Sequence, residues 1–303
     1  IKPIRLGNLV GNKFRIKVTN SKNNENDIED IFSDLKGFFP NYFGVQRFGT
    51  VRPITHIVGE KIVNGDYEGA VFDYLTFSSP NFAGHAGREY LSKTRDFVKS
   101  LEKFPPHMLF ERQLLGHLSR NKDDYTGAIL QLPESLSKML VHGYQSLIFN
   151  KVLDMRIKEG MDACLPQIGD CVMPADGYGG PDQRVTIEVT KRNQAKLSKR
   201  CNEGKAWVAG LLPGANSTFS KGRQGELEKE VMDEFGVKFG DFIIEDIPEL
   251  SSYGMYRPLF QKYNDIEVVY DSGDPVFTFW LHKGTYATSF LREIMKSSDV
   301  TVY

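Results

Sequence analysis

The stretch from Asn41 to Gly49 holds the side chains best suited to chemistry in this 303-residue chain. It follows Pro40 and reads Asn-Tyr-Phe-Gly-Val-Gln-Arg-Phe-Gly. Its glycines and polar residues suit neither a helix interior nor a buried strand, so they predict a rigid loop. An aromatic ring on such a loop can stack on a nucleobase, while amides and a guanidinium bind polar edges or phosphate. The alternative is that Phe43 and Phe48 are core residues that close a turn beneath a sheet.

A basic strand is predicted near the N-terminus of the chain. Residues 13–18 alternate between basic and apolar side chains, which is the period of a half-buried strand. Lys13, Arg15 and Lys17 would share the exposed face of this strand, where they could contact phosphates.

Helices and further strands must position the loop. A helix capped by Asn26 or Asp27 and ended by Gly37 would lead into it. Residues 88–118 predict two helices, broken at the prolines of positions 105 and 106. The other predicted helices lie at 134–157, 193–201, 224–235 and 287–296, and the other strands at 185–189, 206–212, 266–270 and 276–281.

Charge is balanced over the whole chain but uneven along it. With 38 basic and 39 acidic residues, the total says nothing in favour of a nucleic-acid partner. Residues 1–20 carry five basic side chains and no acidic one, and residues 183–205 carry seven basic and two acidic. Residues 225–249 carry nine acidic side chains and two lysines. A polyanion would therefore meet the first two regions and avoid the third, unless these are only solvated faces.

The distribution of cysteine, histidine and apolar residues excludes several classes of protein. Cys164, Cys171 and Cys201 are odd in number and lack Cys-x-x-Cys spacing, which favours a reducing compartment over a disulfide framework or a zinc site. The six histidines are scattered, so we expect no metal. No apolar run approaches the ~20 residues of a membrane helix. We therefore expect a protein of a reducing compartment without a membrane partner.

The loop sequence resembles a known signature. It matches every fixed position of Asn-x-Phe-Gly-x-Gln-Arg-Phe-Gly, the motif of the TruD family of RNA pseudouridine synthases. Residues 6–18, 204–214 and 284–294 resemble further segments of that family in the same order, and residues 51–56 look most like archaeal members. The resemblance covers most of the chain and is loose from about residue 82 to 133.

This resemblance implies an α+β fold. The core would be a pseudouridine-synthase-type mixed or antiparallel sheet with flanking helices, interrupted by an inserted α/β domain, the TRUD domain. Residues 1–136 would form the catalytic core, with a helical insertion at about 82–133. Residues 137–257 would form the inserted domain, and residues 258–303 would return to the core.

The resemblance also implies an activity and roles for individual residues. The protein would convert uridine to pseudouridine in folded tRNA, at a U13-type site, without cofactor or metal. The base would be flipped into a pocket, where Phe43 would stack on it and the Asn41 amide would hold a catalytic carboxylate. The contacts to RNA are expected from Lys13, Arg15, Lys17, Gln46, Arg47, Tyr286, Thr288 and Arg292. For Arg292 the alternative is an ion pair with a core acid.

The nucleophilic aspartate of the family belongs to a Gly-x-Lys-Asp-Lys segment, which we do not find in this chain. We expect that segment to lie upstream of Ile1, and we expect the protein to act as a monomer on tRNA. The likeness to archaeal members implies a cytoplasmic protein, and a eukaryotic source would imply a nuclear one. Two alternatives remain open: an RNA-binding module that aids tRNA folding without catalysis, and an α/β enzyme that acts on a free nucleotide.

Overall fold

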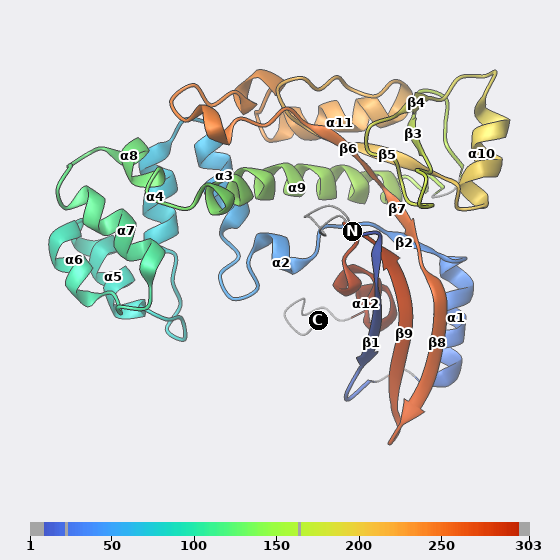
Figure 1. Cartoon of the computed structure of the whole chain (residues 1–303), viewed down its shortest axis with the longest axis horizontal. Coiled ribbons are helices and arrows are strands. Elements are labelled where there is room, and N and C mark those ends of the chain that lie inside the picture. The colour runs from blue at the N-terminus through green and yellow to red at the C-terminus, as the bar shows by residue number, and fades with distance from the viewer. Residues whose placement is uncertain (1–8, 22–23, 163–164, 297–303) are drawn as a thin grey trace, which may run out of the picture.

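The computed structural model describes residues 9–21, 24–162 and 165–296. It confirms the predicted α+β class, with helices around antiparallel sheets. The long helix α9 (Glu134–Lys158) runs through the middle of the molecule, and the other elements surround it (Figure 1). Its buried residues recur along its full length, because α3, α11 and β5 pack against it.

A group of short helices lies at the N-terminal end of α9 (Figure 1). The sequence predicted two helices across residues 88–118, whereas the structure has three. The additional break comes at Arg95, which adopts a left-handed φ of 53°, and the Asp96 side chain then caps the next helix by accepting from the Lys99 amide. The group comprises α3 (Thr55–Val63), α4 (Tyr67–Thr76), α5 (His85–Thr94), α6 (Phe97–Lys103), α7 (Leu109–Leu118) and α8 (Tyr125–Ile129).

A four-stranded antiparallel sheet with strand order β4-β3-β5-β6 lies at the other end of α9. Every residue of β5 is buried, since α9 and α10 pack against that strand. The strand predicted at 185–189 is only two residues long. The elements of this part are β3 (Cys171–Pro174), β4 (Ile187–Glu188), α10 (Gln194–Asn202), β5 (Ala206–Leu212), α11 (Gly222–Glu234), β6 (Met255–Pro258) and the 3-10 turns η1 (Phe239–Phe242) and η2 (Pro248–Leu250).

A second sheet with strand order β1-β9-β8 projects below α9 (Figure 1). Phe14 lies opposite Phe279 in the β1–β9 register, and their rings stack with centroids 5.4 Å apart. A short β2–β7 ladder joins this part to the rest of the chain. The elements are β1 (Gly11–Lys17), α1 (Glu25–Leu35), β2 (Phe38–Pro40), α2 (Val45–Phe48), β7 (Phe260–Lys262), β8 (Asn264–Asp271), β9 (Asp274–His282) and α12 (Ala287–Met295).

The N-terminus of α1 differs from the prediction. Asn24 caps the helix, rather than Asn26 or Asp27. The Asn24 side chain accepts from the Asp27 amide at 3.1 Å, and the Asp27 carboxylate accepts from the Asn24 amide at 2.9 Å. This reciprocal pair satisfies two free amides at once, so the helix begins two residues earlier than a single cap at Asn26 would allow.

The largest apolar cluster joins residues 54–132 to residues 140–161 and 227–250. It therefore crosses position 137, where the predicted catalytic core gives way to the predicted inserted domain. A shared core couples the two segments, and the division of the chain at residues 137 and 258 stays a prediction.

Candidate functional site

The Asn41–Gly49 loop is fixed between β2 and α3 by contacts to distant parts of the chain. The backbone amide of Asn41 donates to the backbone carbonyl of Leu259 at 2.8 Å. This bond attaches the loop to the junction of β6 and β7. The loop also contains one helical turn, α2, which begins after Gly44 and was not predicted. Gly44 has no room for a side chain, since a Cβ would come within 2.6 Å of the Thr288 hydroxyl and 2.7 Å of the Gln46 side-chain oxygen.

Phe43 lies inside this site with only 6% of its surface exposed. Its ring packs edge-on against Phe149 of α9 and Tyr286, with centroids 5.6 and 5.9 Å away. Asn150 of α9 clamps its backbone, accepting from the Phe43 amide at 2.8 Å and donating to the Phe43 carbonyl at 3.0 Å. Asn150 was not predicted, because nothing in the local pattern of α9 separates it from other helix residues.

Arg257 is the second residue that the sequence analysis missed. It lies on β6, its guanidinium carbon is 4.0 Å from the centroid of the Phe43 ring, and the residue is 8% exposed. It donates to the Asn41 carbonyl and side-chain oxygen and to the Gly284 carbonyl. Burial lowers the pKa of Arg257 to about 9. No Asp or Glu in the described ranges forms an ion pair with it, so it is a buried cation held by neutral oxygens. The sequence signal that could have pointed to Arg257 is a single charged residue in an otherwise uncharged strand.

The Asn41 side chain is buried and belongs to the same network. Its oxygen accepts from Arg257 at 2.8 Å, and its nitrogen donates to the Pro258 carbonyl at 2.8 Å. An amide nitrogen carries two hydrogens, so one donor remains beyond the Pro258 bond. Its predicted contact with a carboxylate is not formed within the described residues, and that role stays a prediction.

The start of α12 closes the site. Thr288 donates to the Gln46 side-chain oxygen at 3.1 Å, and Ser289 donates to the Tyr42 carbonyl at 2.8 Å. The Arg292 guanidinium lies 5.5 Å from the Tyr42 ring and forms no ion pair with an acid of the described chain. Burial raises the pKa of Tyr42 to about 12, with the Asp154 charge contributing, so this phenol stays protonated near neutral pH.

A cavity of about 200 Å³ opens where these elements meet. The structure thus brings Phe43, Thr288 and Arg292 to one cavity, with Gln46 and Tyr286 beside it. Arg47 also borders the site, with its guanidinium carbon 5.1 Å from the Phe43 ring centroid. The cavity is lined by Tyr42, Phe43, Gly44, Val45, Phe48, Asn150, Thr288, Ser289 and Arg292.

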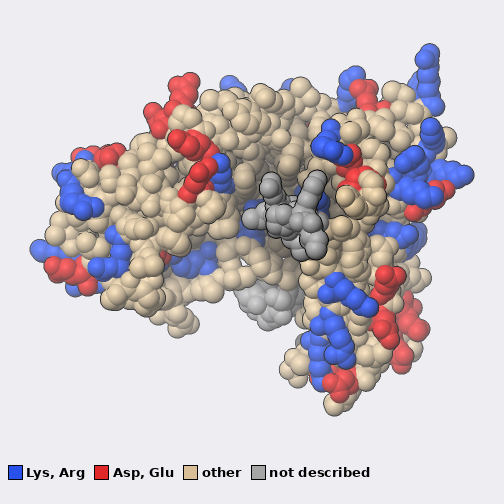
Figure 2. All heavy atoms as spheres, viewed as in Figure 1, with Lys and Arg blue, Asp and Glu red and all other residues tan. Residues whose placement is uncertain are grey.

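The basic strand lies apart from this cavity. Lys13, Arg15 and Lys17 are exposed on β1, and Figure 2 shows a group of basic side chains over that strand and another over α10. Lys17 is paired with Asp271 at 3.0 Å, and this hydrogen bond raises the Lys17 pKa. Neither Lys13 nor Arg15 has an ion-pair partner among the residues that the structure describes.

The described residues contain no group of three or more His, Cys, Asp or Glu side chains that could hold a metal ion. Within the same ranges, no helix is long and apolar enough to cross a membrane. Cys171 is a free thiol, and Cys164 lies outside the described residues.

Comparison with known proteins identifies the family. The family model for tRNA pseudouridine synthase D (TruD) matches residues 1–294. Proteins named "Probable tRNA pseudouridine synthase D" are 38% identical in Methanosarcina barkeri and 34% identical in Pyrococcus furiosus, covering 97% and 98% of this chain and 70% and 72% of those proteins. A crystal structure described as TruD from Methanosarcina mazei aligns with a TM-score of 0.91 at 36% identity, over 100% of this chain and 72% of that one.

The chain therefore belongs to the TruD family, and the resemblance found in its sequence, including its likeness to archaeal members, is confirmed.

Proposed function

We propose that this protein is a tRNA pseudouridine synthase, an isomerase that converts a uridine of folded tRNA, at a U13-type site, to pseudouridine. The observation that carries the proposal is the complete Asn41–Gly49 signature held against a cavity by α9, β6 and α12. The relatives' names and the family match support it.

The reaction needs a base that has left its stack. The bond between the ribose and the ring nitrogen must break, the base must turn, and the sugar must rejoin a ring carbon. Flipping the base costs a few kcal/mol, and stacking on an aromatic side chain returns ~1–3 kcal/mol. We assign this stacking to Phe43. Since Arg257 covers its ring, the base would enter from the cavity side or displace the guanidinium.

Asn41 and Arg257 are assigned to the catalytic carboxylate. The remaining Asn41 donor and the buried Arg257 charge would both favour an ionised aspartate, because hydrogen bonds and a nearby cation stabilise the charged form. Arg257 fits this role because it is buried without an ion-pair partner among the described residues, an arrangement that is costly until an anion arrives.

The other predicted residues are assigned to the RNA around the target. Tyr286, Thr288 and Arg292 would contact the base or its phosphate, since Thr288 and Arg292 line the cavity and the Tyr286 ring packs beside it against Phe43. Gln46 and Arg47 would brace the loop beside the RNA. The basic face of β1, formed by Lys13, Arg15 and Lys17, would meet more distant phosphates.

The proposed function also includes the domain organisation of the chain, its oligomeric state and its location. We propose a catalytic core at 1–136 and 258–303, interrupted by a TRUD domain at 137–257, with residues 82–133 as a helical insertion. We further propose that the protein acts on tRNA as a monomer in the cytoplasm, without cofactor or metal, as the family resemblance implies.

The test is to incubate the complete natural protein, its intact mass measured, with unmodified tRNA and to map the modified uridines. One uridine converted to pseudouridine is expected. Salt-sensitive binding with every uridine unchanged would instead support the RNA-binding module without catalysis. Binding of a mononucleotide without binding of folded RNA would support an enzyme acting on free nucleotides.

A further inference from the structure

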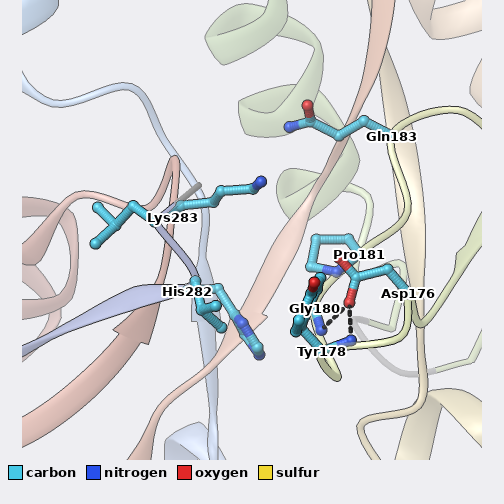
Figure 3. Close-up of a pocket in the computed structure, with 9 residues that line it drawn as sticks. Asp176, Tyr178, Gly180, Pro181, Gln183, His282 and Lys283 are labelled. Atoms are coloured by element: carbon cyan, nitrogen blue, oxygen red, sulfur yellow. Dashed lines mark hydrogen bonds between the residues drawn. The ribbon is translucent and has the colours of Figure 1, made fainter. Parts of the chain in front are cut away.

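A second pocket lies between the β9 strand end and the loop that connects β3 to β4 (Figure 3). Its volume is about 90 Å³, enough for one edge of a planar ring but not for a whole nucleotide. His282 and Lys283 line it from the strand end, and Asp176, Tyr178 and Gln183 line it from the loop. In Figure 3 the Lys283 and Gln183 side chains extend from opposite sides of the opening.

His282 gives this pocket a polar group that the fold does not satisfy. It is 9% exposed, and its Nδ1 atom is buried without a hydrogen-bond partner in the described part of the chain. The indole rings of Trp280 and Trp207 pack edge-on against the imidazole, with ring centroids 4.4 and 5.9 Å away. Burial lowers the His282 pKa, so the ring is neutral near pH 7 and offers one donor and one acceptor nitrogen. The neutral ring thus leaves its Nδ1 atom without a partner in the wall of the pocket, next to Gly180.

The loop displays an aromatic ring beside this histidine. Tyr178 is 79% exposed at the tip of a Gly-Tyr-Gly-Gly turn. The Asp176 carboxylate fixes the turn by accepting from the Tyr178 amide at 2.8 Å and the Gly180 amide at 3.0 Å, as the dashed lines in Figure 3 show. Gly180 allows the close approach, because a Cβ there would lie 3.1 Å from His282 Nδ1. A ring on a fixed backbone can stack on a base with little loss of conformational entropy.

The charges favour a neutral, polar and planar ligand inside the pocket, with an anion only at its rim. The Asp176 carboxylate lies in the wall and would repel a phosphate, whereas Lys283 could meet one at the opening. A nucleobase carries donors and acceptors on its edge and a phosphate on its backbone, so it fits both requirements.

The pocket is also close in the fold to the proposed target-base site. Lys283 precedes Gly284, whose carbonyl accepts from Arg257 at 2.6 Å. The Arg257 guanidinium in turn lies over the Phe43 ring. Two sites connected by one arginine could hold two nucleotides of the same strand.

We propose that this pocket binds a second, unpaired nucleobase of the RNA substrate, next to the target uridine in sequence. The base stacks on Tyr178, its polar edge faces His282 and Gln183, and its phosphate lies near Lys283. This inference rests on the proposed function, because it requires an RNA substrate.

The experiment is a double-substitution cycle on the complete protein and unmodified tRNA. The protein carries Tyr178→Ala, and in the RNA each nucleotide flanking the modified uridine is replaced in turn by an abasic one. We expect Tyr178→Ala to weaken tRNA binding about 10-fold. One abasic replacement should cost the wild-type protein a similar factor and cost the Tyr178→Ala protein almost nothing further, because both remove the same stack.

Two control variants and a second test variant keep the experiment specific. Tyr178→Phe retains the ring and should bind like the wild type, and Gln183→Ala should weaken binding without altering the fold. Tyr253→Ala removes another tyrosine that is 60% exposed and should change nothing. Independent, additive effects of Tyr178→Ala and every abasic replacement would overturn the inference alone. Failure of the wild-type protein to bind tRNA would overturn the proposed function with it.

Discussion

Two loops in this protein carry an aromatic residue directly before a glycine, and the fold treats them in opposite ways. In the Asn41–Gly49 loop Phe43 is 6% exposed, whereas in the loop of residues 176–183 Tyr178 is 79% exposed. The first loop is fixed by Asn150 and Arg257, more than a hundred residues away in sequence. The second is fixed by its own Asp176. Hydrogen bonds fix both loops, but distant elements decide whether the ring is enclosed or displayed.

The difference has a functional consequence. An enclosed ring with a clamped backbone has one position, which suits a group that must hold a reacting base in register. A displayed ring on a locally fixed turn adds affinity and tolerates variation in what it stacks on. The enclosed loop should therefore affect turnover and stability, and the displayed loop should affect RNA binding.

Phe43→Ala should produce the largest effect. Removing a buried phenylalanine typically costs ~3–5 kcal/mol of unfolding free energy, and the lost stack should remove most pseudouridine formation. Denaturant unfolding and initial rates on unmodified tRNA measure the two effects. Phe43→Leu keeps much of the volume without a ring, so it should retain more stability yet still lose at least about 10-fold in kcat/KM. Normal turnover in Phe43→Leu would refute the stacking role.

Asn150→Ala should come next, because it leaves the Phe43 amide and carbonyl without their partner. Each buried polar group left unpaired costs ~1–3 kcal/mol, so we expect a loss of about 2 kcal/mol or more in unfolding free energy. Turnover should fall with it, since the loop loses its fixed position. The exposed Asn121 is the matched control, and Asn121→Ala should stay within about 0.5 kcal/mol of the wild type. Equal losses of unfolding free energy in Asn150→Ala and Asn121→Ala would show that the distant contact of Asn150 does not fix the Asn41–Gly49 loop.

The basic face of β1 should have a smaller effect, on binding alone. Lys13→Gln and Arg15→Gln should each reduce the slope of log Kd against log salt by about 1 if each side chain meets one phosphate. Lys17→Gln should do less, because Lys17 already pairs with Asp271. Titrations of tRNA at several salt concentrations measure this, with Lys93→Gln in α5 as the control. Unchanged salt slopes in both Lys13→Gln and Arg15→Gln would show that the RNA does not contact the basic face of β1.

Acidification should produce the smallest effect. Burial lowers the pKa values of His282 and His56, so the unfolded state takes up a proton before the folded state does. The stability that depends on their neutral forms is complete above about pH 6.5 and is lost as pH falls through 6.5 toward the lower folded-state values. We expect Tm to fall between pH 7 and 5.5. In His282→Gln this fall should be shallower, whereas His107→Gln, at an exposed position, should follow the wild type. A Tm independent of pH across this range would contradict the effect.

Much of the fold could be predicted from local pattern. The alternation at residues 13–18 predicted β1, and the apolar stripe at 134–157 predicted α9, because both periods are properties of the backbone itself. The errors lie at helix ends, where several neighbouring residues could have served as the cap. Asn24 forms a reciprocal cap with Asp27 ahead of the predicted caps, and Asp96 begins a new helix where apolar spacing alone predicted continuity.

The candidate site was predictable only in part. The Asn41–Gly49 signature and residues 284–294 are contiguous in sequence, so they could be found as strings, and the family match bears out the resemblance. Asn150 and Arg257 carry no signature. Each sits in an otherwise ordinary element, and its importance comes from a partner more than one hundred residues away.

The sequence by itself determined the family, the α+β class and most of the helices and strands, because these depend on periodicity and on short runs of residue types. Only the tertiary structure decided that Phe43 is enclosed, that Arg257 lies over it without an ion-pair partner in the described chain, and that His282 borders a second pocket. Burial and hydrogen bonding are set by which distant elements pack together, and that information is not contained in any single stretch of the chain.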